Sequence, residues 1–153
     1  MNLPAGRTIY KSGMENQLPP ITGVLETVLY AADLDAALGF YQGVIGLEHI
    51  SGDVAFSLGF RVASDAVLLI FDPAKSGTPG RDLPSHGSIG TGHIAFRIPD
   101  DAYDNWLARL ESAAIPIEHQ ERWEPENPEN PRSIYIRDPA GNSVELITQD
   151  IWR

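Results

Sequence analysis

The chain has 153 residues, of which 42% are hydrophobic and 21% charged, and this size and composition fit one globular domain and exclude a disordered or fibrous protein. The net charge of −10 opposes binding to nucleic acids and anionic membranes, so the expected partner is a small molecule. The absence of cysteine excludes disulfides and thiol nucleophiles, and a bound metal must be held by nitrogen and oxygen.

No part of the sequence has the pattern of a membrane span or an export signal. The longest apolar run, residues 66–71, is far shorter than the ~20 residues that a membrane-spanning helix needs. The first twenty residues lack the unbroken apolar centre of a secretory signal. We therefore expect a soluble, cytoplasmic protein with an N-terminal extension (1–20), a single domain (21–148) and a C-terminal tail (149–153).

Residues 21–73 carry the pattern of one strand, one helix and three further strands. The segment VLETVLY, residues 24–30, alternates so that a strand would place Leu25 and Leu29 on one face and Glu26 on the other. Asp33 is then positioned to cap an amphipathic helix that ends near residues 43–46. The apolar side of this helix has the spacing i, i+3, i+4, i+7, at Leu34, Ala37, Leu38 and Tyr41. Strands are predicted at residues 47–50, 55–60 and 66–71.

Residues 92–148 repeat this order after a connector, residues 74–91, that is rich in Pro, Gly and Ser. The segment HIAFRI predicts a strand over residues 93–98, with His93 and Arg97 on one face. Asp100 or Asp101 is expected to cap a second helix that runs to about Ala113. Further strands are predicted at residues 115–118, 133–137 and 143–148.

The spacing of these elements indicates that one unit has been duplicated. Each first strand carries a polar residue, Glu26 or His93, seven residues before an aspartate at the start of the helix. When the closing strands VLLIFD and SVELIT are aligned, Leu69 falls opposite Glu145. Matching order and spacing predict an α+β domain made of two modules, residues 21–73 and 92–148.

Three separated motifs resemble the vicinal-oxygen-chelate superfamily, which includes glyoxalases, bleomycin resistance proteins and ring-cleaving dioxygenases. The first, VLETVLYAADLDAALGFYQGVIGLE, is similar to the opening of these proteins. GHIAF resembles the start of their second module, and DPAGNSVEL resembles their final hairpin. The resemblance covers residues 21–148 and implies two βαβββ modules whose curved sheets enclose a cleft. It also implies a homodimer, since such proteins often exchange modules between chains.

The resemblance further implies a metal site built from the first and last strands of each module. The four matching positions are Glu26, Leu69, His93 and Glu145, of which Leu69 cannot bind a metal. Two carboxylates and one imidazole leave positions open for substrate oxygens and are compatible with Mn, Fe, Ni, Co, Zn or Mg. In an exchanged dimer, Glu26 of one chain would meet His93 and Glu145 of the other. Either glutamate could also act as the catalytic base, a role taken from the family.

Each of these residues also has a purely structural interpretation. The glutamates could pair with Arg97 or Arg137, or face solvent, and His93 could be a hydrogen-bonded strand residue. Other candidates for the site are His86, as a base or further ligand from the connector, and Trp123, as a lid over the ligand. Arg97, Tyr135 and Arg137 could orient an anionic or phenolic substrate, or could instead form surface and cross-strand pairs.

Three functions are consistent with the sequence. The first is a metal-dependent lyase or isomerase of the glyoxalase type, acting on a small molecule with vicinal oxygens. The second is a metal-free protein that binds antibiotics, a reading that Leu69 favours. The third, a ring-cleaving dioxygenase, is disfavoured because Glu26 stands where that family has a histidine. No Walker loop or dinucleotide fingerprint is present, so no nucleotide or flavin cofactor is expected.

Overall fold

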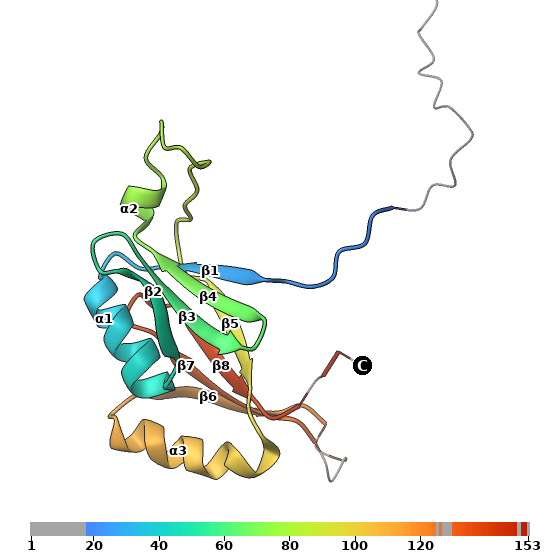
Figure 1. The fold of residues 1–153 in the computed structure, drawn as a ribbon. Coiled ribbons are helices and arrows are strands. Elements are labelled where there is room, and N and C mark those ends of the chain that lie inside the picture. Colours follow the sequence, from blue (N-terminus) through green and yellow to red (C-terminus); the bar gives the residue numbers. More distant parts are fainter. Residues whose placement is uncertain (1–17, 125, 127–129, 150, 153) are drawn as a thin grey trace, which may run out of the picture.

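The computed structural model describes residues 18–124, 126, 130–149 and 151–152. Most of the predicted N-terminal extension, residues 1–17, lies outside this part of the chain. The strands form two four-stranded sheets, with the orders β1-β4-β3-β2 and β5-β8-β7-β6 (Figure 1). Each sheet belongs to one predicted module, so the α+β fold with two βαβββ units is confirmed.

Module one begins with the predicted strand and a capped helix. Asp33 is the N-cap of the first helix, since its side chain accepts a hydrogen bond of 2.9 Å from the backbone N–H of Ala36. Gly46, with a φ of +84°, ends the helical segment, as predicted. The elements are β1 (Glu26–Tyr30), α1 (Leu34–Leu38), a π-helical segment (Gly39–Ile45), β2 (Glu48–Asp53), β3 (Ser57–Ala63), β4 (Ala66–Phe71) and α2 (Pro73–Ser76).

Module two repeats the order but starts its helix differently. Neither Asp100 nor Asp101 caps α3, because both lie inside a short 3-10 turn that follows Pro99 without a side-chain cap. The cap prediction was therefore wrong. The elements are β5 (His93–Arg97), the 3-10 turn (Asp100–Ala102), α3 (Tyr103–Ser112), β6 (Ile117–Arg122), β7 (Arg132–Arg137) and β8 (Ser143–Ile147).

The strand registers of the two modules are equivalent. β1 runs parallel to β4 with Glu26 opposite Val67, and β5 runs parallel to β8 with His93 opposite Ser143. Two residues further along the closing strands stand Leu69 and Glu145. The pairing therefore places these two residues at equivalent positions, as the sequence alignment predicted.

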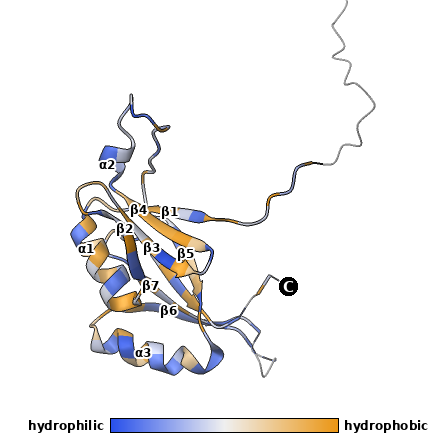
Figure 2. Ribbon diagram, viewed as in Figure 1, coloured by the Kyte–Doolittle hydropathy of each residue, from blue (hydrophilic) through white to orange (hydrophobic). Residues whose placement is uncertain are grey.

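One face of each sheet packs into the core, and the other is available for a site. Figure 2 shows hydrophobic and hydrophilic residues mixed along α1 and α3. This pattern is expected for amphipathic helices, which pack one side against a sheet and expose the other to solvent. The buried strand residues of both sheets alternate with the site positions; they include Leu29, Leu68, Ile70, Phe96, Val144 and Leu146.

The turn at residues 138–142 joins the two modules. The Tyr41 hydroxyl, in module one, donates a hydrogen bond of 2.9 Å to the buried carboxylate of Asp138. The Asn142 amide donates to the carbonyl of Tyr30 and accepts from the N–H of Gly92. The sequence motif DPAGN is thus an internal junction as well as a hairpin turn.

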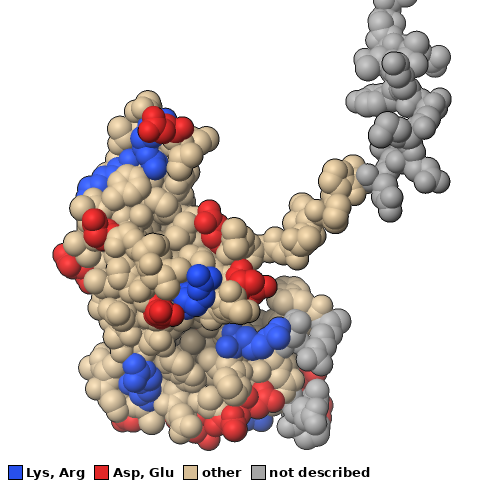
Figure 3. Space-filling view, in the orientation of Figure 1, with Lys and Arg blue, Asp and Glu red and all other residues tan. Residues whose placement is uncertain are grey.

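The described helices include none that is both long and apolar enough to cross a membrane. Figure 3 shows acidic and basic side chains interspersed over one face of the described residues.

Candidate functional site

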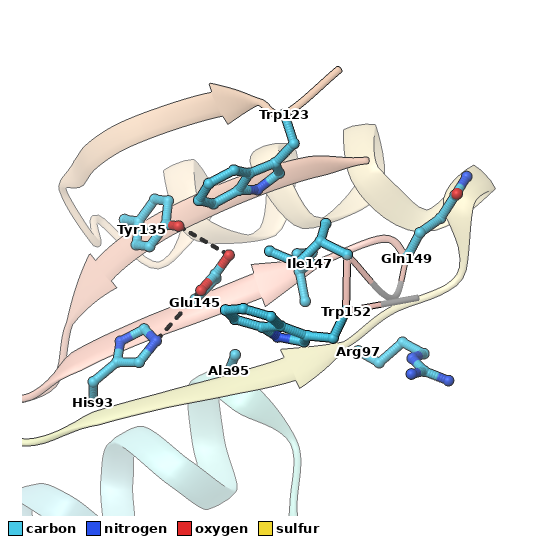
Figure 4. Close-up of a pocket in the computed structure, with 10 residues that line it drawn as sticks. His93, Ala95, Arg97, Trp123, Tyr135, Glu145, Ile147, Gln149 and Trp152 are labelled. Atoms are coloured by element: carbon cyan, nitrogen blue, oxygen red, sulfur yellow. Dashed lines mark hydrogen bonds and ion pairs between the residues drawn. The ribbon is translucent and has the colours of Figure 1, made fainter. Parts of the chain in front are cut away.

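The exposed face of the second sheet brings together polar residues from β5, β8 and β7. Because side chains alternate along a strand, His93, Ala95 and Arg97 point away from the core while Ile94 and Phe96 point toward it. The ladder then aligns Ala95 with Glu145, and Glu145 with Tyr135. Figure 4 shows the side chains of His93 and Tyr135 directed at Glu145.

Glu145 is buried, with 6% of its surface exposed, and its two oxygens have different partners. Oε1 accepts hydrogen bonds from the hydroxyls of Ser133, at 2.5 Å, and Tyr135, at 3.0 Å. Oε2 lies 3.4 Å from Nε2 of His93, whose side chain is half exposed. Burial and the Glu145 carboxylate raise the pKa of Tyr135 to about 12, so the phenol remains a hydrogen-bond donor at neutral pH.

This cluster lines a cavity of about 540 Å³. The indole rings of Trp123 and Trp152 contribute to its walls (Figure 4). Trp123, which is 42% exposed, also donates its indole N–H to Ser133 Oγ at 2.8 Å. The full lining comprises His93, Ala95, Arg97, Trp123, Tyr135, Glu145, Ile147, Gln149, Ile151 and Trp152. Three of the residues predicted to bind substrate, Arg97, Trp123 and Tyr135, line this cavity.

Glu26 does not join His93 and Glu145 within this chain. It is exposed at the start of β1 and lines a separate cavity with residues of β4 and β5. Among the described residues, no three His, Asp or Glu side chains are grouped so that they could hold a metal ion. The structure thus assembles two of the three predicted ligands.

His86 and Arg137, two further candidate site residues, lie outside this cavity. His86 Nδ1 is 2.9 Å from the Tyr30 hydroxyl, and its ring packs edge-on against Phe71 at 4.7 Å. These contacts anchor the connector to module one. Arg137 forms a bidentate ion pair with Glu118, in which Nε and Nη2 donate to the two carboxylate oxygens at 2.7 and 2.9 Å. The guanidinium is therefore engaged in a cross-strand pair.

The sequence interpretation did not assign Ser133, Gln149 or Trp152 to the site. Ser133 alternates with Tyr135, which indicates a shared face, but nothing local indicates that it donates to Glu145. Gln149 and Trp152 were assigned to a tail, because the strand pattern ends near residue 148. Their position in the cavity wall depends on how the chain turns after β8.

Comparisons with known proteins agree with this fold over nearly the whole described chain. The model of the Glyoxalase/Bleomycin resistance protein/Dioxygenase superfamily matches residues 23–146. A crystal structure of lactoylglutathione lyase from Agrobacterium tumefaciens is 42% identical, covers 88% of this chain and 98% of its own, and superposes with a TM-score of 0.78.

More distant structures share the fold alone. A glyoxalase/dioxygenase from Nostoc punctiforme is 20% identical, with coverage of 90% and 99% and a TM-score of 0.65. A mutant of the fosfomycin resistance protein FosX from Listeria monocytogenes, crystallised with Mn(II) and 1S,2S-dihydroxypropylphosphonic acid, is also 20% identical, with coverage of 86% and 94% and a TM-score of 0.62.

Proposed function

The chain belongs to the Glyoxalase/Bleomycin resistance protein/Dioxygenase superfamily, and we propose that it is a divalent-metal-dependent lyase or isomerase acting on a small molecule with two neighbouring oxygens. The observation that carries this proposal is the His93–Glu145 pair, which faces a cavity large enough for a small-molecule ligand. The 42% identity to a lactoylglutathione lyase supports the reaction class.

The donor atoms of this pair suit a divalent cation. His93 Nε2 and Glu145 Oε2 are 3.4 Å apart, so one ion could contact both. Glu145 Oε1 is already engaged by two hydroxyl donors, which leaves Oε2 for the ion. An imidazole with a carboxylate admits Mn²⁺, Fe²⁺, Ni²⁺, Co²⁺ or Zn²⁺, and such an ion would supply Lewis acidity to the substrate oxygens.

A homodimer would complete the ligand set. Glu26 is exposed at the start of β1, the edge strand of its sheet, and takes no part in the His93–Glu145 cluster of its own chain. If modules are exchanged, Glu26 of the partner subunit would approach His93 and Glu145. Light scattering of the metal-loaded protein tests this arrangement, because a monomer that retains all three ligands would contradict it.

The remaining cavity residues would bind and orient the substrate. Arg97 and Tyr135 line the cavity with polar groups, and Trp123 contributes an apolar wall. Once substrate is bound, the Glu145 carboxylate would shift from metal ligand to base and carry a proton to or from the substrate. Glu26 is the alternative base.

Elemental analysis of wild type, His93→Ala and Glu145→Ala proteins tests the proposal directly. We expect about one transition metal per chain in the wild type and loss of the metal in both variants. Arg137→Ala is the matched control, since its surface pair with Glu118 lies outside the cavity. Activity would then be screened with hemithioacetals, diols and catechols. Full activity after treatment with a chelator would overturn the proposal.

A second candidate is a metal-free protein that binds a planar drug. Leu69 at the fourth ligand position and the two indole rings in the cavity favour it. Calorimetry with chelator-treated protein distinguishes the candidates. Tight binding of an antibiotic such as bleomycin without turnover would favour the binding protein, whereas binding that requires metal would favour the enzyme.

A further inference from the structure

A directed chain of hydrogen bonds links the cavity wall to the proposed metal ligand. The indole N–H of Trp123 lies 2.8 Å from Ser133 Oγ, and Ser133 Oγ lies 2.5 Å from Glu145 Oε1. An indole nitrogen can only donate, so Ser133 must accept from Trp123. The single hydroxyl proton of Ser133 is therefore left to point at Glu145.

The same chain determines which oxygen of Glu145 is available. Oε1 accepts from both Ser133 and Tyr135, whereas Oε2 lies toward His93. Ser133 is completely buried, so bulk water cannot replace either of its hydrogen-bond partners. Rotation of the carboxylate would break two hydrogen bonds that the low-dielectric surroundings strengthen.

We propose that Ser133 and Trp123 are positioning residues that act through Glu145, holding Oε2 toward His93 and coupling the cavity wall to this oxygen. This proposal rests on the proposed function, because it assumes that Glu145 Oε2 is a metal ligand. Trp123 has two contacts with different roles, since its ring lines the cavity and its N–H holds the Ser133 hydroxyl. A ligand that displaces the ring would remove the N–H that Ser133 accepts, so the orientation of the Ser133 hydroxyl toward Glu145 would no longer be enforced.

Manganese affinity, measured by calorimetry on the full chain, is the first test. Changes to residues that orient a metal ligand typically cost about 10- to 100-fold in affinity, so we expect Ser133→Ala to weaken Mn²⁺ binding by about 10-fold. Trp123→Phe keeps an aromatic wall but removes the N–H, and a smaller loss of about 3-fold is expected. Ser133→Thr keeps the hydroxyl and should restore most of the affinity. Wild-type affinity in Ser133→Ala would overturn the proposal.

The indole N–H resonances provide a readout that does not depend on metal. Trp106 packs against the core on α3 and serves as the internal reference, and Trp123→Phe assigns the signal of Trp123. In metal-free protein, Glu145→Gln should shift the resonance of Trp123 and leave that of Trp106 unchanged. The shift should disappear when Ser133→Ala is added.

The two tests separate failure of this proposal from failure of the proposed function. A wild-type protein that binds no Mn²⁺ but shows the Trp123 shift would refute the metal site and retain the positioning chain. A protein that binds Mn²⁺ with no shift of the Trp123 resonance in Glu145→Gln would refute the coupling and retain the metal site.

Discussion

Modules one and two share a strand register but differ in what they place on it. Where module two pairs Glu145 with Tyr135, module one pairs Leu69 with Gly59. A Cβ atom at Gly59 would lie 2.3 Å from Ser51 Oγ and 3.3 Å from the Leu69 side chain, so a larger residue there would require both side chains to shift. A buried carboxylate needs hydrogen-bond donors on the neighbouring strand, and only module two has them at this position. The two modules thus have equivalent positions, and the neighbouring strand determines which one can hold an acid.

The largest effect should come from making module two resemble module one. Glu145→Leu removes the proposed ligand and base, so we expect metal content to fall below detection and any turnover to decrease at least ~100-fold. Stability should fall by about 1–3 kcal/mol, because the hydroxyls of Ser133, which is fully buried, and Tyr135 lose their acceptor. Elemental analysis and urea unfolding measure the two quantities, with Glu145→Gln as the matched control. Retained metal in Glu145→Leu would place the site elsewhere.

A mutation at the junction between the modules, residues 138–142, should have the next largest effect, and this effect is on the free energy of unfolding. The Asp138 carboxylate accepts hydrogen bonds from the Tyr41 hydroxyl, the Asn142 side chain and the backbone N–H groups of Ala140 and Asn142. Asp138→Ala leaves these buried donors unpaired, and a loss of about 3–5 kcal/mol in unfolding free energy is expected. Asp82→Ala, at an exposed loop position, is the control. A loss of less than 1 kcal/mol, on the order of one ordinary hydrogen bond, would show that the turn does not hold the modules together.

Installing an acid in module one should not create a ligand. Leu69→Glu places a half-buried carboxylate beside Gly59, which has no side chain to donate to it, and should cost about 1–3 kcal/mol. Thermal unfolding gives the stability, and calorimetry with Mn²⁺ gives the affinity, which should not increase. A higher metal affinity in this variant would mean that the fourth position is usable and that donors from module one are unnecessary.

The smallest expected effect is on stability at alkaline pH. The folded state raises the pKa of Tyr135 to about 12, while the unfolded chain releases this proton near pH 10. The contribution is therefore complete below pH 10 and is lost as the pH rises toward 12. Burial and Asp138 also raise the pKa of Tyr41, which adds to the same loss. Tyr135→Phe should show a shallower decline in unfolding free energy over this range, measured by urea titration at several pH values. An unchanged decline would assign the whole effect to other tyrosines.

Local pattern was sufficient to predict the fold and the faces of the strands. Alternation placed Glu26 and His93 on the strand faces opposite to their apolar neighbours, because each side chain of a strand points opposite to the next. Alignment of the closing strands placed Glu145 at the position equivalent to Leu69. The structural interpretation of Arg137 as a cross-strand pair was also available from sequence and describes what the structure has.

Contacts between distant segments could not be predicted in the same way. His86 is held by Tyr30, 56 residues away, and Tyr41 reaches Asp138 across 97 residues. No periodicity encodes such distances, so neither the contact of His86 with Tyr30 nor the role of Asp138 at the junction was predicted. The separation of Glu26 from the His93–Glu145 pair has the same origin, since it depends on how whole modules pack.

The two hydroxyl donors on Oε1 would limit Glu145 to monodentate coordination of the proposed metal ion. Ca²⁺ prefers six to eight oxygen ligands and often uses both oxygens of a carboxylate, whereas Mn²⁺, Fe²⁺ and Zn²⁺ accept a single oxygen beside an imidazole nitrogen. The proposed site, which presents one oxygen of Glu145 and one nitrogen of His93, would therefore discriminate against calcium before any other ligand is in place.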